Sequence, residues 1–195
     1  MHLVVSSSNR NKVLELQKLG LPYQSFTLDQ VMNPVPEFIE DGATFEENAI
    51  KKLQGLPLMS DRIYLSDDSG LEVNALGGGP GIYSARYAGV GATGQQMCHK
   101  ILEATSGFQD RGARFVCVIA LLFPSGKIET FRGTVSGVLA PHMRGESGFG
   151  YDPIFIPEGY TLTYGELGDS VKSETSHRAQ ALKQVKHRLQ ANLDL

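Results

Sequence analysis

Residues 113–123 read ARFVCVIALLF and residues 128–140 read IETFRGTVSGVLA, with the tetrapeptide PSGK between them. The first segment is apolar along almost its whole length, which is typical of a strand that is buried on both faces. Two long strand-like segments joined by a short turn predict a β-hairpin. We therefore expect this hairpin to lie at the centre of a sheet.

The segments on either side of the hairpin supply helices and shorter strands. Capping residues followed by apolar side chains at helical spacing indicate the helices, and short apolar runs indicate the strands. The expected strands are 3–6, 62–66 and 150–157. The expected helices begin at the caps Asn9, Thr44, Thr93 and Ser176, and two of them cover 45–55 and 176–193. The expected loops are 29–43 and 77–81. This order predicts an α/β fold with a mixed β-sheet and flanking helices.

The composition argues against several classes of protein. Lys and Arg number 18 and Asp and Glu number 21, a net charge of −3, whereas general nucleic-acid binding requires a basic surface. No apolar run approaches the ~18 residues of a membrane span. Cys98 and Cys117 are far apart, which favours two buried thiols in a reducing, cytoplasmic setting. Since no linker or repeat interrupts the chain, we expect residues 1–195 to form a single domain.

One glycine motif is misleading. Residues 89–94 match the dinucleotide-binding pattern G-x-G-x-x-G, but that site requires a preceding strand and a βαβ unit near the start of the chain. The segment that precedes this motif is SARYA, so we interpret 89–94 as a glycine-rich loop that enters a helix.

Two polar segments each follow an expected strand. SSSNRNK (6–12) leads into a helix whose free amides suit an anion, and Lys12 is a cation in the first turn, where the helix dipole disfavours one. Asp67 and Asp68 follow the strand 62–66 and precede Ser-Gly, so their carboxylates should lie at the carboxyl edge of the sheet and suit Mg²⁺. The alternatives are an ordinary Asn cap with a solvated Lys12, and an Asx turn.

Two further segments have features of nucleotide recognition. Residues 148–153 read GFGYDP, where glycines flank an aromatic ring that could stack on a base. Lys172, His177 and Arg178 lie near an expected helix start and suit phosphate. The alternatives are a packed turn and solvated charges. Together, the four segments contain the groups that a Mg²⁺-dependent nucleotide-hydrolysing site requires.

In this order, the segments resemble the inosine triphosphate pyrophosphatase family, which hydrolyses non-standard purine nucleoside triphosphates. The resemblance reaches from Ser7 to Leu182, and its strongest blocks are TFEENAIKK, SDDSGLEVNALGGGPGIYSARYAG, RFVCVIAL, GFGYDPIF and KSETSHRAQAL. It implies an elongated mixed α/β fold with two lobes around a central cleft, commonly assembled as a homodimer. It also implies Mg²⁺-dependent conversion of ITP, dITP and XTP to the monophosphate and pyrophosphate. The composition itself argues against nucleic acid or a membrane as a partner.

The resemblance also implies a role for individual residues. By position, the triphosphate loop is Ser7, Ser8, Asn9, Arg10, Asn11 and Lys12. Asp68 is the general base or metal-linked acid, and Ser69 beside it touches the substrate. The base pocket is Phe149, Gly150, Tyr151 and Asp152, and the remaining substrate contacts are Lys172, His177 and Arg178. Asp68 and one acid of the 37–41 stretch, for which we choose Glu40, would bind the metal. The family usually has Thr at position 7 and Ala at position 66, where this chain has Ser.

Two other functions remain open at this point. A septum-associated pyrophosphatase that acts on modified pyrimidine nucleotides would lack GFGYDPIF and SHR. A non-catalytic nucleotide sensor would not need the water-activating acid that Asp67 and Asp68 supply alongside Lys12 and Lys172.

Overall fold

The computed structural model describes residues 1–7, 9–21 and 23–191. The elements in chain order are β1 (His2–Ser6), α1 (Arg10–Lys18), β2 (Ser25–Thr27), α2 (Leu28–Val31), α3 (Phe45–Lys51), β3 (Arg62–Val73), η1 (Asn74–Leu76), η2 (Gly81–Arg86), α4 (Gly94–Ala104), β4 (Gly112–Leu122), β5 (Ile128–Leu139), η3 (Asp152–Ile154), β6 (Phe155–Pro157), α5 (Tyr164–Thr175) and α6 (His177–Gln190). Within these described ranges, every helix is too short or too polar to cross a bilayer.

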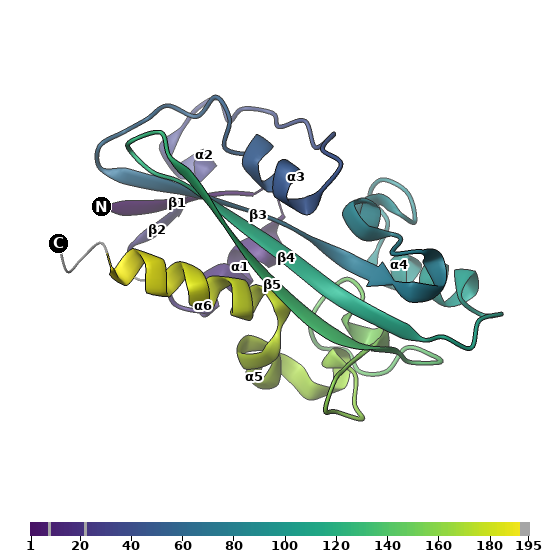
Figure 1. Ribbon diagram of the computed structural model, residues 1–195. Helices are drawn as coiled ribbons and strands as arrows, with labels where there is room; N and C mark the ends of the chain where they lie inside the picture. The colour runs from purple at the N-terminus through teal and green to yellow at the C-terminus, as the bar shows by residue number, and fades with distance from the viewer. Residues whose placement is uncertain (8, 22, 192–195) are drawn as a thin grey trace. The chain divides into compact units, whose positions relative to one another are not determined.

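The strands form one mixed sheet in the order β2-β1-β3-β4-β5-β6. Figure 1 labels the strands from β1 to β5. β1 runs parallel to both β2 and β3, whereas β5 and β6 are antiparallel. Parallel pairs near the N-terminus need helical crossovers, and the hairpin does not. The prediction of a mixed sheet with flanking helices is confirmed.

The hairpin that the sequence predicts is present as β4 and β5, which are neighbours in the sheet. Its turn is closed by the Phe123 amide, which donates to the Lys127 carbonyl at 2.9 Å, and by the Gly126 amide, which donates to Phe123. Gly126 has φ +83°, a conformation that glycine adopts without steric penalty. The apolar strand β4 is buried from Phe115 to Leu122, as a central strand should be.

The chain divides into two compact units. Unit 1 contains 1–68, 117–133 and 180–195, and unit 2 contains 69–116 and 134–179. The strands β3, β4 and β5 each contribute a segment to both units.

In unit 1, opposite faces of β1 and β3 receive different helices because side chains alternate along a strand. Leu3 and Val5 belong to the core that also contains Leu16 of α1 and Leu182 of α6. On the other face, the hydroxyl of Ser6 donates to the Lys52 carbonyl, just past the last residue of α3. Cys117 is a free buried thiol in the same core as Leu3.

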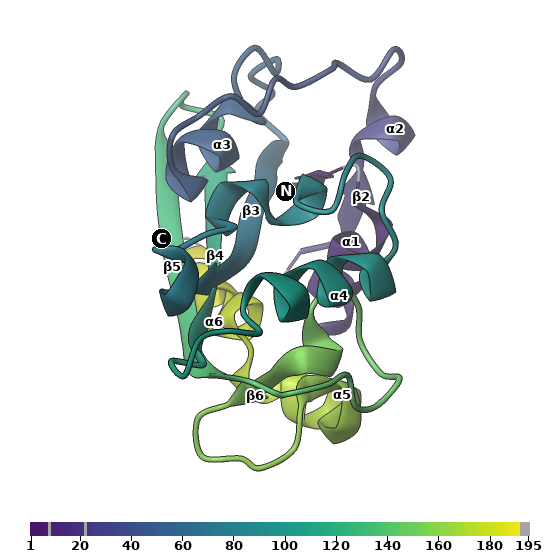
Figure 2. The ribbon, with the colours of Figure 1, turned by 90° about the vertical axis from the view of Figure 1, so that its right-hand side faces the viewer.

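Unit 2 has a separate core, which includes Leu71 of β3, Ile101 of α4 and Phe155 of β6. Cys98, a free thiol, is buried there, so both cysteines are reduced and buried as predicted. In Figure 2, α5 lies beside β6, and contacts between these two elements confirm the proximity. This unit therefore stabilises itself by burial of apolar side chains that belong to it alone.

Most predicted helix starts are confirmed. Asn9 caps α1, Thr93 and Gln96 form a capping box on α4, and the hydroxyl of Ser176 accepts from the Ala179 amide at the start of α6. The start of α3 differs in detail.

At α3, Thr44 accepts from the Glu47 amide, but the Glu47 carboxylate accepts from the Ala43 amide instead of from Thr44. The helix also ends at Lys51, short of the predicted residue 55, although Leu53 remains buried beyond it.

Other predictions need correction. The predicted loop 29–43 begins with the end of α2, and the strand β2 and the helix α5 were not expected. Glycines weaken the helix signal of α5, where Gly168 has φ +76° and interrupts the helical backbone. The strand expected at 150–157 is reduced to β6, because Asp152–Ile154 form a 3₁₀ turn.

Candidate active site

The acidic pair of β3 lies inside the strand and not at its end. β3 continues to Val73, so the prediction that the acids follow a strand end is wrong. The last pair of residues that β1 and β3 share is Ser6 with Ser66. Asp67 and Asp68 therefore come directly after the point where the parallel strand β1 stops, at the edge where ligands bind in α/β sheets.

Asp67 is held by the helix that follows β1. Its Oδ2 lies 3.3 Å from Nζ of Lys12, and the Asp67 side chain is fully buried. Lys12 is 13% exposed, so the alternative of a solvated lysine is wrong. The ion pair explains why a cation occurs in the first turn of α1, since the nearby carboxylate offsets the unfavourable helix dipole.

Asp68 points toward α3. Its Oδ1 lies 3.2 Å from Nζ of Lys52, and its Oδ2 accepts from Nδ2 of Asn48 at 3.3 Å. Burial raises the pKa of Asp68, and the charges of Lys52 and Lys12 offset that rise in part. A buried carboxyl with a raised pKa is better suited to accept a proton near neutral pH than an exposed one.

Lys52 joins the acidic groups of this cluster. Besides Asp68, its Nζ contacts Oε1 of Glu40 at 3.2 Å and donates to the Asp67 carbonyl at 2.9 Å. Burial acts to lower the pKa of Lys52, but the carboxylates of Asp68, Asp67 and Glu40 outweigh it and raise that pKa. The ammonium is therefore held in its charged form.

Glu40 and Asp68 fit the ligand set of a magnesium ion. Both carboxylates lie 3.2 Å from Nζ of Lys52, so they are close enough to each other to contact one cation. Mg²⁺ is typically held by one or two carboxylates with water and substrate phosphates completing the shell. Within 1–7, 9–21 and 23–191, the structure shows no cluster of three or more His, Cys, Asp or Glu side chains suited to a metal.

The segment 7–12 is organised around the cap of α1. Oδ1 of Asn9 accepts from the amides of Asn11 and Lys12 at 3.1 and 3.3 Å, and the Asn9 amide donates to the Ser7 hydroxyl. The Asn cap is therefore confirmed, and Arg10 and Asn11 are exposed. Ser8, also expected in this loop, lies outside the described residues.

In unit 2, Asp152 is the centre of the predicted base-binding turn. Its Oδ2 accepts from the Phe149 amide at 2.7 Å and lies 2.6 Å from Nζ of Lys172. The same Nζ lies 4.4 Å from the centroid of the Phe149 ring. Asp152 and Lys172 are buried, so a desolvated ion pair holds the turn in place. The Lys172 ammonium of that pair also lies against one face of the Phe149 ring.

Tyr151 has a structural contact for its polar group. It is buried, and its hydroxyl donates to the Ser84 carbonyl at 2.8 Å. Burial raises the pKa of this phenol. The carbonyl of Gly150, in the same turn, accepts a hydrogen bond from the Cys98 thiol of α4 at 3.2 Å. This hydrogen bond helps to hold the turn against α4.

His177 and Arg178 are both buried at the start of α6. The His177 ring stacks on Phe115, with ring centroids 4.7 Å apart and planes at 11°. The Arg178 guanidinium donates to the Ser69 hydroxyl at 2.8 Å. The structure therefore brings Ser69 and Arg178 together, two residues that the sequence separates widely.

Sequence reasoning missed Asn48 and Lys52. Both are buried polar residues of the segment that begins with α3, and they occur at i and i+4, on one helical face. A lysine and an asparagine on the same face as the apolar Phe45 and Ala49 were a signal that this face meets something other than a core.

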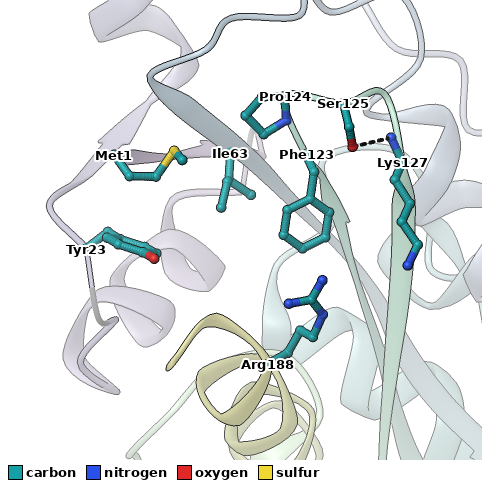
Figure 3. A pocket seen from close by; sticks show the side chains of 8 residues that line it. All are labelled: Met1, Tyr23, Ile63, Phe123, Pro124, Ser125, Lys127 and Arg188. Atoms are coloured by element: carbon teal, nitrogen blue, oxygen red, sulfur yellow. Dashed lines mark hydrogen bonds between the residues drawn. The ribbon is translucent and has the colours of Figure 1, made fainter. Parts of the chain in front are cut away.

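A separate hollow lies in unit 1. This pocket has a volume of about 440 Å³ and is lined by Met1, Tyr23, Ile63, Phe123, Pro124, Ser125, Lys127 and Arg188 (Figure 3). The described residues that we expected in the active site do not include any of these. The guanidinium of Arg188 lies 4.9 Å from the centroid of Phe123.

Comparison with known proteins gives consistent matches. The family model described as the Ham1 family matches residues 3–188. A dITP/XTP pyrophosphatase of Desulfotalea psychrophila is 42% identical over 194 residues, covering 94% of this chain and 83% of its own length. One from Deinococcus radiodurans is 45% identical over 182 residues, covering 92% and 88%. The solved structure of the Staphylococcus aureus Ham1 protein has a TM-score of 0.88 at 38% identity, covering 98% of this chain and 100% of that chain.

Proposed function

Because the chain belongs to the Ham1 family, we propose that it hydrolyses ITP, dITP and XTP to the monophosphate and pyrophosphate, which removes non-standard purines from the nucleotide pool. Relatives that match over most of the chain carry the name dITP/XTP pyrophosphatase. The observation that carries the proposal within the molecule is the buried Asp68, which contacts Lys52 at 3.2 Å.

In this proposal, the residues of unit 1 handle the triphosphate. Asp68 orients a water molecule and accepts its proton as the water oxygen bonds to the α-phosphorus. The bond from the α-phosphorus to the bridging oxygen breaks, and pyrophosphate leaves. Lys12 and Lys52 supply positive charge for the phosphates, and the segment 7–12 supplies the start of α1.

We propose Mg²⁺ as the cofactor, bound by Glu40 and Asp68. When bound, such an ion neutralises charge that develops on the phosphate oxygens and on the leaving group. The support for this assignment is the approach of both carboxylates to Nζ of Lys52, each at 3.2 Å.

The residues of unit 2 handle the base and the remaining contacts. The ring of Phe149 has Lys172 against one face, and its other face would stack on the purine. His177 or Arg178 would hydrogen-bond to the 6-oxo group. Adenine has a 6-amino group, which would leave a donor of the enzyme unpaired and so be rejected.

The test is release of pyrophosphate from a panel of ITP, dITP, XTP, GTP, ATP and dTTP with Mg²⁺. We expect ITP, dITP and XTP to be hydrolysed well above the others. Equal rates with GTP and ITP would reject the non-standard purine assignment. A preference for dTTP would favour a pyrimidine-directed enzyme instead.

We also propose that the protein is a homodimer, as the resemblance implies, and that it is cytoplasmic, which its two free, buried cysteines support. Light scattering coupled to size-exclusion chromatography tests the oligomeric state. A monomer at micromolar concentration would contradict this part of the proposal.

A further inference from the structure

Two side chains of the α3 segment connect the Glu40 loop to Asp68. Lys52 contacts Glu40 Oε1 and Asp68 Oδ1, each at 3.2 Å. Asn48 accepts from the Gly42 amide through Oδ1 at 2.8 Å and donates from Nδ2 to Asp68 Oδ2 at 3.3 Å. Each side chain therefore bridges the loop segment 40–42 to a different oxygen of Asp68.

The two bridges differ in the charge of the side chain and in the groups that it contacts on the loop. Lys52 contacts both carboxylates that we propose as metal ligands, so a divalent cation bound there would compete with the Lys52 ammonium for them. Asn48 is neutral and fully buried, and it contacts the Gly42 amide and Oδ2 of Asp68, whereas Lys52 contacts Oδ1 of Asp68. Its bridge does not compete with a cation for Glu40.

The loop side of the Asn48 bridge is closely fitted. A Cβ at Gly42 would lie 2.7 Å from Oδ1 of Asn48 and 2.8 Å from Cβ of Glu47. Glycine at this position therefore allows the backbone to approach α3 closely enough for the Gly42 hydrogen bond. The next amide, that of Ala43, donates to Glu47 at 2.8 Å, so α3 holds two successive residues of the loop.

From these contacts, we propose that Asn48 is a positioning residue that fixes Glu40 relative to Asp68 for divalent-cation binding. The inference rests on the proposed function, because it requires that these two carboxylates bind the cation. Groups that orient metal ligands typically change metal affinity 10–100-fold when they are removed. Asn48 has this role through hydrogen bonds to the loop and to Asp68, without itself touching the cation.

The test is titration of the full-length, nucleotide-free protein with Mn²⁺, with free Mn²⁺ followed by electron paramagnetic resonance. Asn48→Leu keeps the branching of the side chain and removes both hydrogen bonds. Gly42→Ala would place a Cβ 2.7 Å from Oδ1 of Asn48 and so disturbs the bridge at its loop end. We expect each to raise the Kd for Mn²⁺ by about tenfold, in the same direction as Glu40→Gln. The matched control is Ser66→Ala, whose lost hydroxyl donates to the Ala49 carbonyl on the same helix and touches neither carboxylate.

A second readout separates positioning from a general loss of structure. In Asn48→Leu, the Mg²⁺ concentration for half-maximal activity should rise about tenfold, while KM for ITP at saturating Mg²⁺ stays within twofold of wild type. Normal Mn²⁺ affinity in both Asn48→Leu and Gly42→Ala, with Glu40→Gln weakened, would overturn the role of Asn48 alone. If Asn48→Leu does not fold, Gly42→Ala decides. Normal Mn²⁺ affinity in Glu40→Gln would overturn the proposed metal site and this inference together.

Discussion

At the scale of single residues, the acids of β3 have different ion-pair partners because they face opposite sides of the strand. Asp67 pairs with Lys12 and Asp68 pairs with Lys52, so each carboxylate has its own ion-pair partner. Burial raises the pKa of Asp68, and a raised pKa suits the transfer of a proton from water. The assignment of the base to Asp68 can therefore be tested without removing Asp67.

Asp68→Asn keeps the size of the side chain and removes its charge and its basicity. We expect the rate of pyrophosphate release from ITP to fall by at least about a hundredfold, while nucleotide binding stays measurable by calorimetry. Asp61→Asn is the control, since Asp61 is an exposed acid that pairs with Arg62, and it should retain full activity. Near-normal turnover by Asp68→Asn would contradict the role of Asp68 as the base.

Tyr151 should contribute to stability more than to catalysis through its hydroxyl. Tyr151→Phe removes the buried hydrogen bond to the Ser84 carbonyl, so the free energy of unfolding should fall by about 1–2 kcal/mol. KM for ITP should change less than threefold, because the ring that we expect to meet the base belongs to Phe149. Urea denaturation and steady-state kinetics measure the two effects. A large rise in KM with unchanged stability would show that the hydroxyl meets substrate.

At the scale of elements, the turn 148–152 is built by close contact between a glycine and an ion pair. Gly148 has φ +78°, and a Cβ there would lie 2.1 Å from Oδ2 of Asp152. That oxygen also meets Lys172 and the Phe149 amide. The turn therefore depends on glycine for its backbone conformation and for the space that Asp152 occupies.

Gly148→Ala should displace the Asp152 carboxylate and with it the ring of Phe149. We expect KM for ITP to rise about tenfold, equivalent to roughly 1.4 kcal/mol of binding. The matched control is Gly159→Ala, because Gly159 has φ +84° with nothing within 4 Å. That variant carries the strain of positive φ alone, so its stability should fall while KM stays unchanged. Equal KM values for both variants would refute the steric argument.

At the scale of the whole molecule, stability rests on side chains that join distant parts of the chain. The core of unit 1 combines β1, α1 and β4 with α6 from the far end of the sequence. On its surface, the Arg188 guanidinium of α6 donates to both carboxylate oxygens of Glu129 on β5, at 2.7 and 3.0 Å. Arg188 also lies against Phe123, so one side chain ties α6 to the hairpin.

This pair makes stability depend on pH. The hydrogen bond from Arg188, with a further contribution from Lys127, lowers the pKa of Glu129 from 4.5 to about 2. A depressed pKa means that the ionised carboxylate stabilises the folded state above pH 4.5, and that this contribution is lost as pH falls through about 2.

Glu129→Gln should therefore lower the free energy of unfolding at pH 7 by about 1–2 kcal/mol, allowing for solvent screening. The difference between wild type and variant should shrink as pH falls from 4.5 toward 2. Urea denaturation at several pH values measures it. A difference that stays constant over this range would contradict the ion-pair explanation.

The sequence by itself determined the features that depend on local pattern. The hairpin of β4 and β5, the caps at Asn9, Thr93 and Ser176, and the reduced state of the cysteines follow from periodicity, turn chemistry and spacing. The family could also be inferred, because GFGYDPIF and the other quoted blocks resemble the motifs of the family in their residues and in their order along the chain. Short or glycine-containing elements such as β2 and α5 could not be predicted from the sequence. Their intrinsic propensities are weak, so tertiary packing determines whether they form.

Only the tertiary structure decided which polar groups meet. The run SDDSG suggests a strand end, yet β3 continues through it as a neighbour of β4. Asn48 and Lys52 look like ordinary residues of a helical segment until folding buries them against Asp68. The physical reason is that hydrogen bonds and ion pairs between residues far apart in the chain depend on register and burial, which local sequence does not encode.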